Sequence, residues 1–142
     1  MGRIMAIDFG QKRSGIAVTD PLQMIATGLE TVPSGQLLDY IKKYINSEVV
    51  ECIVVGEPRD MQNNASDASR FTEPFVKRLQ LAFPEMPIKR YDERFTSKMA
   101  FQTMIDAGLS RKKRQDKALI DTVSATIILQ SYLESIKNHH KL

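Results

Sequence analysis

Residues 4–32 read IMAIDFGQKRSGIAVTDPLQMIATGLETV and contain three short apolar runs separated by polar turns. The runs are Ile4–Ile7, Gly15–Thr19 and Met24–Val32. Short apolar runs joined by turns are typical of adjacent antiparallel strands. This segment therefore predicts a three-stranded meander at the start of the chain.

Beyond residue 32 the apolar residues recur at helical spacing, interrupted by two further strand patterns. Cys52–Gly56 is an unbroken apolar run, typical of a strand buried on both faces, and Ile88–Tyr91 predicts a fifth strand. The segments with helical spacing are 37–45, 71–83, 99–105 and about 116–136. Their candidate N-caps are Ser34, Ser66, Thr96 or Ser97, and Asp116.

The order βββαβαβαα predicts a single α/β domain over residues 1–142, with a mixed five-stranded sheet flanked by helices. The length, with 42% hydrophobic and 26% charged residues, suits one soluble globular domain. No apolar stretch approaches the roughly 18 residues of a membrane span, and the N-terminus lacks the apolar core of a signal peptide. The one cysteine, Cys52, excludes an internal disulfide and a multi-cysteine zinc site. We therefore expect a cytoplasmic protein with no membrane partner.

Acidic residues follow three of the predicted strands. Asp8 ends the first strand, Glu57 follows the fourth, and Asp92 and Glu93 end the fifth. If these three strands are parallel, their carboxyl ends meet at one edge of the sheet. Each acid also has an ordinary explanation: Asp8 as a turn residue, Glu57 as a solvated loop residue, and Glu93 as the partner of Arg94.

Asp121 lies on the apolar face of the predicted last helix. A carboxylate there is costly unless it is paired or binds a cation. The small residues Ser124 and Ala125 allow this helix to approach the sheet and bring Asp121 towards the strand ends. Alternatively, a hydrogen bond to Ser124 or Lys117 satisfies Asp121 within its own helix.

A cluster of carboxylates without histidine or cysteine suits Mg²⁺ or Mn²⁺. Two such ions about 3.5–4 Å apart can activate water and stabilise the leaving oxygen when a phosphodiester is cleaved. The acids therefore indicate a metal site of the kind found in nucleases.

Positive charge is unevenly distributed, although the formal net charge is only +3. Lys12 and Arg13 lie next to the turn after Asp8 and are candidate contacts for phosphates, and Arg94 is a candidate for orienting the phosphate that is cut. The consecutive cations Arg111, Lys112, Lys113 and Arg114 form a candidate clamp on a nucleic-acid backbone, because phosphate contacts supply affinity independent of sequence. A solvated loop is the alternative for this segment.

Five segments together resemble the YqgF/RuvX family of pre-ribosomal-RNA nucleases and Holliday junction resolvases. They are residues 6–10 (AIDFG), 15–17 (GIA), 55–58 (VGEP), 91–96 (YDERFT) and 121–125 (DTVSA), in order along essentially the whole chain. The resemblance implies an RNase H-like three-layer fold. It also implies a metal-dependent endonuclease acting on structured nucleic acid, in 5′-end processing of pre-16S rRNA or in resolution of branched DNA.

The resemblance implies that Asp8, Glu93 and Asp121 are the catalytic acids and hold Mg²⁺ or Mn²⁺. Family members commonly carry Gly-Leu-Pro where this chain has Gly56-Glu57-Pro58, so Glu57 is the alternative to Glu93 as the second acid. We favour Glu93.

Two other functions remain open at this point. One is a non-catalytic module that binds RNA or DNA with a retained nuclease fold. The other is a fragment of an actin-like ATPase, suggested by the hairpin from Asp8 to Gly15 and disfavoured because a second such hairpin is missing. The sequence also leaves open a monomer or a homodimer, the latter suiting a two-fold-symmetric junction.

Overall fold

A computed structural model describes residues 2–58, 69–92, 96–110 and 116–140. Its centre is one five-stranded sheet in the order β3-β2-β1-β4-β5. The strands are β1 (Arg3–Asp8), β2 (Arg13–Thr19), β3 (Ala26–Pro33), β4 (Val50–Glu57) and β5 (Ile88–Asp92). The first three pair antiparallel, while β1 with β4 and β4 with β5 pair parallel. The predicted meander and mixed sheet are confirmed.

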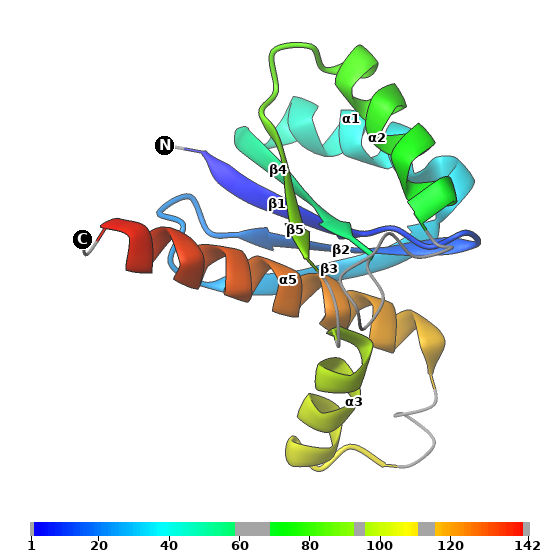
Figure 1. Ribbon diagram of the computed structural model, residues 1–142, viewed down its shortest axis with the longest axis vertical. Helices are drawn as coiled ribbons and strands as arrows, with labels where there is room; N and C mark the ends of the chain where they lie inside the picture. Colours follow the sequence, from blue (N-terminus) through cyan, green and yellow to red (C-terminus); the bar gives the residue numbers. More distant parts are fainter. Residues whose placement is uncertain (1, 59–68, 93–95, 111–115, 141–142) are drawn as a thin grey trace.

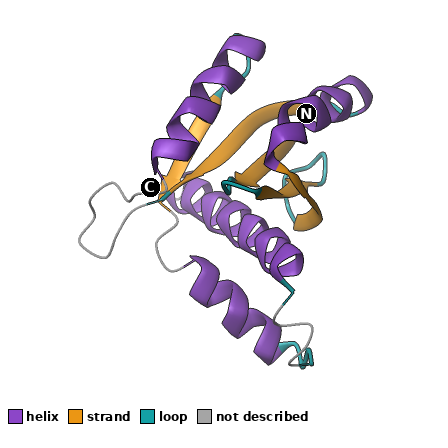
Figure 2. Cartoon of the chain, turned by 90° about the vertical axis from the view of Figure 1, so that its right-hand side faces the viewer, coloured by secondary structure: helices purple, strands orange, loops and turns teal. Residues whose placement is uncertain are grey.

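Helices cover both faces of the sheet (Figures 1 and 2). A short 3₁₀ helix, η1 (Ser34–Gln36), leads into α1 (Leu37–Ser47), which lies with α2 (Ser69–Ala82) on one face. The long helix α5 (Lys117–His140) crosses the other face. The remaining helix, α3 (Thr96–Asp106), packs against α5 and projects away from the sheet. No helix in the described ranges is both long and apolar enough to cross a membrane.

The two faces bury separate apolar cores because successive strand residues point to opposite sides. Met5 and Ile7 of β1 belong to the core under α1 and α2. Ile4 and Ala6 of the same strand belong to the core under α5. The same alternation holds in β4, where Ile53 and Val55 belong to the first core and Cys52 and Val54 to the second. It therefore indicates on which face of the sheet the side chain at the end of each strand lies.

One predicted helix cap is wrong and another is confirmed. The N-cap of α1 is Gln36, without a side-chain hydrogen bond, and Ser34 is the first residue of η1 and does not cap α1. The Ser34 hydroxyl donates to the carbonyl of Gly10 (2.5 Å) and pairs with the buried Ser14 hydroxyl (2.8 Å). Because the buried hydroxyl of Ser14 needs a hydrogen-bond partner, the Ser34 side chain binds it and does not cap α1.

At α5 the predicted cap is present. The Asp116 carboxylate accepts hydrogen bonds from the backbone amides of Ala118 (3.0 Å) and Leu119 (3.3 Å). The helix continues to His140, beyond its predicted end. The candidate cap Ser66 lies outside the described residues, and the side chains of Thr96 and Ser97 do too.

Candidate active site

Asp8 ends β1 on the face that α5 covers. It follows Ile4 and Ala6 at steps of two residues, and both of these pack under α5. In the sheet Asp8 pairs with Gly15 of β2, and continuing the parallel register of β1 and β4 by one residue pairs it with Gly56. The Asp8 side chain therefore rises from the sheet between two positions that have no side chain.

Gly15 brings α5 directly onto this part of the sheet. A Cβ atom built on Gly15 would lie 2.0 Å from the carbonyl oxygen of Asp121 and 2.9 Å from the amide nitrogen of Thr122. Only a glycine permits such a close approach of two backbones. Because Gly15 is also the sheet partner of Asp8, Asp121 lies over the immediate neighbour of Asp8 and on the same side of the sheet.

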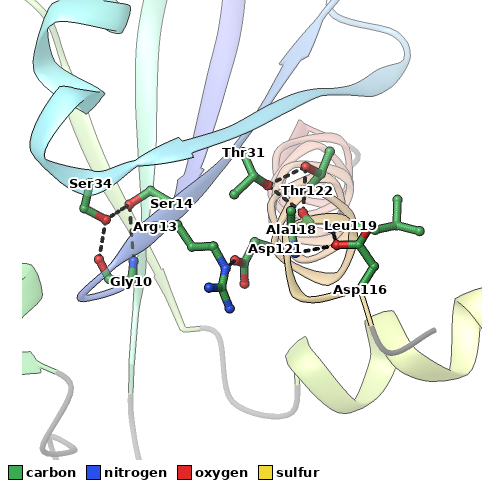
Figure 3. A network of polar contacts seen from close by, with 10 residues as sticks. All are labelled: Gly10, Arg13, Ser14, Thr31, Ser34, Asp116, Ala118, Leu119, Asp121 and Thr122. Atoms are coloured by element: carbon green, nitrogen blue, oxygen red, sulfur yellow. Dashed lines mark hydrogen bonds and ion pairs between the residues drawn. The ribbon is translucent and has the colours of Figure 1, made fainter. Parts of the chain in front are cut away.

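Asp121 forms an ion pair with Arg13, the first residue of β2 (Figure 3). The Nε of Arg13 donates to Oδ2 of Asp121 at 2.9 Å, and the two side chains are 38% and 25% exposed. Burial raises the pKa of Asp121, and the charges of Arg13 and Lys117 only partly offset this effect. The alternative of a hydrogen bond to Ser124 or Lys117 is wrong: the bonding partner, Arg13, comes from the sheet, and Lys117 acts on Asp121 through its charge.

Two threonines hold the start of α5 against β3. The Thr31 hydroxyl donates to the carbonyl of Ala118 at 2.6 Å and pairs with the Thr122 hydroxyl at 2.7 Å. Gly28 makes room for this contact, since a Cβ there would lie 2.6 Å from the Thr122 methyl carbon. Together with the ion pair of Arg13, these contacts fix the position of Asp121 relative to two strands, β2 and β3.

The turn that carries Lys12 and Arg13 is fixed by Ser14 and Ser34. Gly10 donates its backbone amide to Ser14 Oγ at 3.3 Å, and Ser34 donates its amide to the carbonyl of Lys12 at 3.0 Å. The Ser34 hydroxyl closes the network on Gly10, as Figure 3 shows. Both ends of the turn are thereby tied to Ser34, the first residue of η1, so the backbone of Arg13 has a well-defined position.

Glu57 and Asp92 lie at the same edge of the sheet but take the other face. They are paired in the register of β4 and β5. Glu57 follows Ile53 and Val55, which belong to the core under α1 and α2. Alternation therefore directs Glu57 away from the face that carries Asp8 and Asp121. Of the predicted site residues, the structure brings together Asp8, Asp121 and Arg13.

Apart from Lys12, in the turn before β2, and Glu57, on the other face, the remaining predicted site residues lie outside the described part of the chain. They are Glu93, Arg94, Arg111, Lys112, Lys113 and Arg114. Within the described ranges no group of three acidic, histidine or cysteine side chains is placed to hold a metal ion. The carboxylates of Asp8 and Asp121 do have the ligand chemistry that Mg²⁺ and Mn²⁺ prefer, so they fit such an ion provided that a further ligand comes from elsewhere.

Sequence reasoning missed the importance of Gly15 and Gly28. It assigned the close packing of the last helix to Ser124 and Ala125, which are indeed buried. The closest backbone approach, however, is made by the strand glycine beneath the helix. A glycine inside an otherwise apolar strand is a known sign of such an approach, and this signal was present in the sequence.

Comparison with known proteins gives a consistent result. The family model described as "RuvX: Holliday junction resolvase" matches residues 2–135. A protein of Phocaeicola vulgatus named "Putative pre-16S rRNA nuclease" is 58% identical over 137 residues, which cover 96% of this chain and 99% of that protein. A relative of the same name from Bacteroides thetaiotaomicron is 56% identical over 135 residues, covering 95% and 98%.

Among solved structures, the RuvC protein of Thermus thermophilus has a similar fold. The structure of that protein in complex with a Holliday junction substrate superposes with a TM-score of 0.59 at 15% identity, covering 97% of both chains. A second structure of Thermus thermophilus RuvC gives a TM-score of 0.56 at 17% identity and covers 96% of both chains. At this identity the likeness concerns the fold, and it confirms the RNase H-like arrangement of a mixed sheet between helices.

Proposed function

Because the chain belongs to the RuvX family of Holliday junction resolvases, whose members are nucleases, we propose that the face shared by Asp8 and Asp121 is its active site. Its activity is hydrolysis of phosphodiester bonds. As substrate we propose the precursor of 16S rRNA, since relatives more than half identical along nearly their whole length carry that name. Branched DNA is the second candidate, favoured by the description of the family.

The observation that carries this proposal is the meeting of Asp8 and Asp121 on one face. They are separated by more than a hundred residues in sequence. Gly15 links them, because it pairs with Asp8 in the sheet and its backbone contacts the backbone of Asp121. A half-buried carboxylate beside a second one is an expensive arrangement for stability alone. It is a useful one for holding a cation.

We propose Asp8, Asp121 and Glu93 as the ligands of Mg²⁺ or Mn²⁺. In the sequence Glu93 follows β5, which runs parallel to β4, as β4 does to β1, so the carboxyl ends of these strands meet at one edge of the sheet. A bound divalent cation would supply Lewis acidity for the scissile phosphate and lower the pKa of a water molecule. The carboxylates would set the position of that cation, and α5 would keep bulk water from one side of it.

The cations predicted from the sequence complete the proposal. Lys12 and Arg13 leave a turn that is tied down at both ends, beside the proposed metal ligands. Arg94 would orient the phosphate, and residues 111–114, which precede α5 in the chain, would grip the backbone further away. Contacts of this kind supply binding that depends on salt and not on sequence.

The test is a paired cleavage assay of the highly purified full chain. Pre-16S rRNA and a four-way DNA junction are each incubated with Mg²⁺, with Mn²⁺ and with a chelator. We expect cleavage only with a divalent cation and a loss of at least about 100-fold in Asp8→Asn and Asp121→Asn, since carboxylate ligands do most of their work in the transition state. Asp39→Asn, on α1 across the sheet, is the matched control and should cut like the parent.

The same assay separates Glu93 from Glu57 and tests the alternative functions. We expect Glu93→Gln to be inactive and Glu57→Gln, which changes the opposite face, to remain active. An active Glu93→Gln together with an inactive Glu57→Gln would show that Glu57, and not Glu93, is the second acid. Binding of either nucleic acid without cleavage under all metals would favour the non-catalytic module, and parental activity in Asp8→Asn and Asp121→Asn would refute the assigned site.

A further inference from the structure

Arg13 and the proposed metal ion would use the same carboxylate. The Nε of Arg13 donates to Oδ2 of Asp121 at 2.9 Å, within the range of a charge-assisted hydrogen bond. A divalent cation held by Asp121 needs a lone pair on the same small group. It also places two like charges next to one another, which is unfavourable in a half-buried position.

The position of Arg13 suits an exchange of partners. Its backbone is held by the network of Gly10, Ser14 and Ser34, so its side chain can move while its origin stays fixed. The side chain is 38% exposed, which leaves it a way to solvent. In Figure 3 the guanidinium of Arg13 lies beside the carboxylate of Asp121, to which its Nε donates.

We infer that Arg13 is an internal counter-ion that occupies Asp121 in the metal-free protein and competes with the divalent cation for it. Metal binding releases the guanidinium, which then binds a phosphate of the substrate. This inference rests on the proposed function and adds to it a coupling: metal strengthens substrate binding by freeing an arginine, and substrate strengthens metal binding by keeping that arginine occupied.

An arginine is suited to both partners. Its planar group matches a carboxylate in one state and a phosphate in the other, and it stays charged throughout. In the absence of metal it also reduces the cost of a carboxylate that burial disfavours. The same residue therefore stabilises the empty site and contributes to the occupied one.

Metal affinity measured without nucleic acid tests the competition directly. Mn²⁺ is titrated calorimetrically into the full chain, into Arg13→Gln and into Lys117→Gln. Lys117→Gln is the matched control, because it removes one positive charge that acts on Asp121 without a hydrogen bond. We expect Arg13→Gln to bind Mn²⁺ about two- to fivefold more tightly than the parent, as expected from the loss of one partly exposed ion pair. Lys117→Gln should change the affinity less.

Thermal unfolding provides a second readout. Without metal, Arg13→Gln should unfold at a lower temperature than the parent, since Asp121 loses its partner. With Mn²⁺ added, Arg13→Gln should gain more in unfolding temperature than the parent gains, because tighter binding gives greater stabilisation. If Arg13→Gln does not fold, Arg13→Met, which keeps the apolar stem, takes its place in both experiments.

The release of Arg13 to substrate is tested by cleavage at saturating Mn²⁺. We expect Arg13→Gln to raise KM with a smaller effect on kcat, since its contact is to a phosphate. An equal or weaker Mn²⁺ affinity in Arg13→Gln, an equal gain in Lys117→Gln, or an unchanged KM would each overturn the inference. Failure of the parent itself to bind Mn²⁺ would overturn the proposed metal site, and this result is distinct from the others.

Discussion

Two opposing effects act on the carboxylate of Asp121. Its partial burial disfavours the charged form, while the ion pair with Arg13 and the charge of Lys117 favour it. Burial is the larger effect, so the pKa of Asp121 is raised. The charged form of Asp121 is therefore less favourable in the folded, metal-free protein than in the unfolded chain. This balance supports our proposal that Asp121 holds a cation.

The pH dependence of Asp121→Asn follows from this shift. A carboxyl whose pKa is raised by folding favours the folded state at low pH, and this contribution is lost as the pH rises through the folded-state pKa. In the metal-free protein at neutral pH we therefore expect Asp121→Asn to be no less stable than the parent. As the pH is lowered through the carboxyl range, the parent should gain stability relative to the variant.

Urea unfolding at a series of pH values with a chelator present measures this difference. Asp20→Asn is a control with the opposite sign. Hydrogen bonds from the backbone amides of Ile25, Met24 and Leu22 lower the pKa of Asp20, so its contribution is present above the ordinary carboxyl pKa and is lost as the pH falls. A marked loss of stability in Asp121→Asn at neutral pH would contradict the prediction.

At the scale of elements, the N-terminus of α5 places the site. Asp116 satisfies two of the first amides of the helix and puts a negative charge at its positive end. We expect Asp116→Ala to lower the free energy of unfolding by about 1 kcal/mol, within the usual range for a lost cap. Asp116→Asn can still accept these bonds and should recover most of the loss in denaturant unfolding. Equal losses in the two variants would contradict the capping role.

The docking of α5 on the sheet can be tested with three glycines. A Cβ at Gly15 meets the backbone of Asp121, a Cβ at Gly28 meets the side chain of Thr122, and a Cβ at Gly35 meets nothing within 4 Å. Side chains give way more easily than backbone, so the costs should fall in this order. We expect losses of about 3 kcal/mol or more for Gly15→Ala, about 1–2 kcal/mol for Gly28→Ala, and under about 0.5 kcal/mol for Gly35→Ala.

Denaturant unfolding of the three variants gives these values. In addition, Gly15→Ala should lose cleavage activity at temperatures where it is still folded, because α5 must move and take Asp121 with it. Gly35→Ala should retain activity. A stable and active Gly15→Ala would show that the contact between β2 and α5 does not position the site.

At the scale of the whole molecule, cations lie on both faces of the sheet, so net charge alone does not locate the nucleic acid. The proposed contacts belong to the α5 face and to residues 111–114, whereas Lys42, Lys43, Lys77 and Arg78 are exposed on α1 and α2. Changing residues 111–114 to glutamine should weaken binding of a DNA junction and flatten its salt dependence, by about 0.9 in the log–log slope for each lost phosphate contact.

The matched control changes the same number of cations on the opposite face, namely Lys42, Lys43, Lys77 and Arg78. It alters the net charge equally and should leave the salt slope close to that of the parent. Binding is measured by fluorescence anisotropy at several salt concentrations with a chelator present. Equal effects of the two sets would indicate attraction by overall charge, without a defined binding face.

Much of the fold could be predicted because its signals are local. The apolar runs of the meander, the buried strand β4 and the cap at Asp116 each depend on residues a few positions apart. The prediction was wrong where a residue with a local preference has a hydrogen-bond partner from a distant part of the chain. Ser34 is a residue type that commonly caps helices, but its hydroxyl forms a hydrogen bond with the buried hydroxyl of Ser14.

The candidate site was predictable in its residue types and only partly in its geometry. Acids at the ends of parallel strands had to share an edge, but the face each one takes depends on the register of β1 against its neighbours. Asp8 and Glu57 therefore lie at the same edge of the sheet but on opposite faces of it. The partner of Asp121 came from β2, 108 positions away, where local reasoning considered only its own helix.

The amino-acid sequence alone determined the order of strands and helices, the supply of carboxylates for a hard cation and the family. Hydrophobic periodicity and residue chemistry are properties of neighbouring residues, and they survive in any conformation. The tertiary structure decided that α5 rests on Gly15, that Asp121 lies over the strand partner of Asp8, and that Arg13 forms an ion pair with Asp121. These are contacts between distant segments, and they exist only once the sheet has its register and the helix has docked on it.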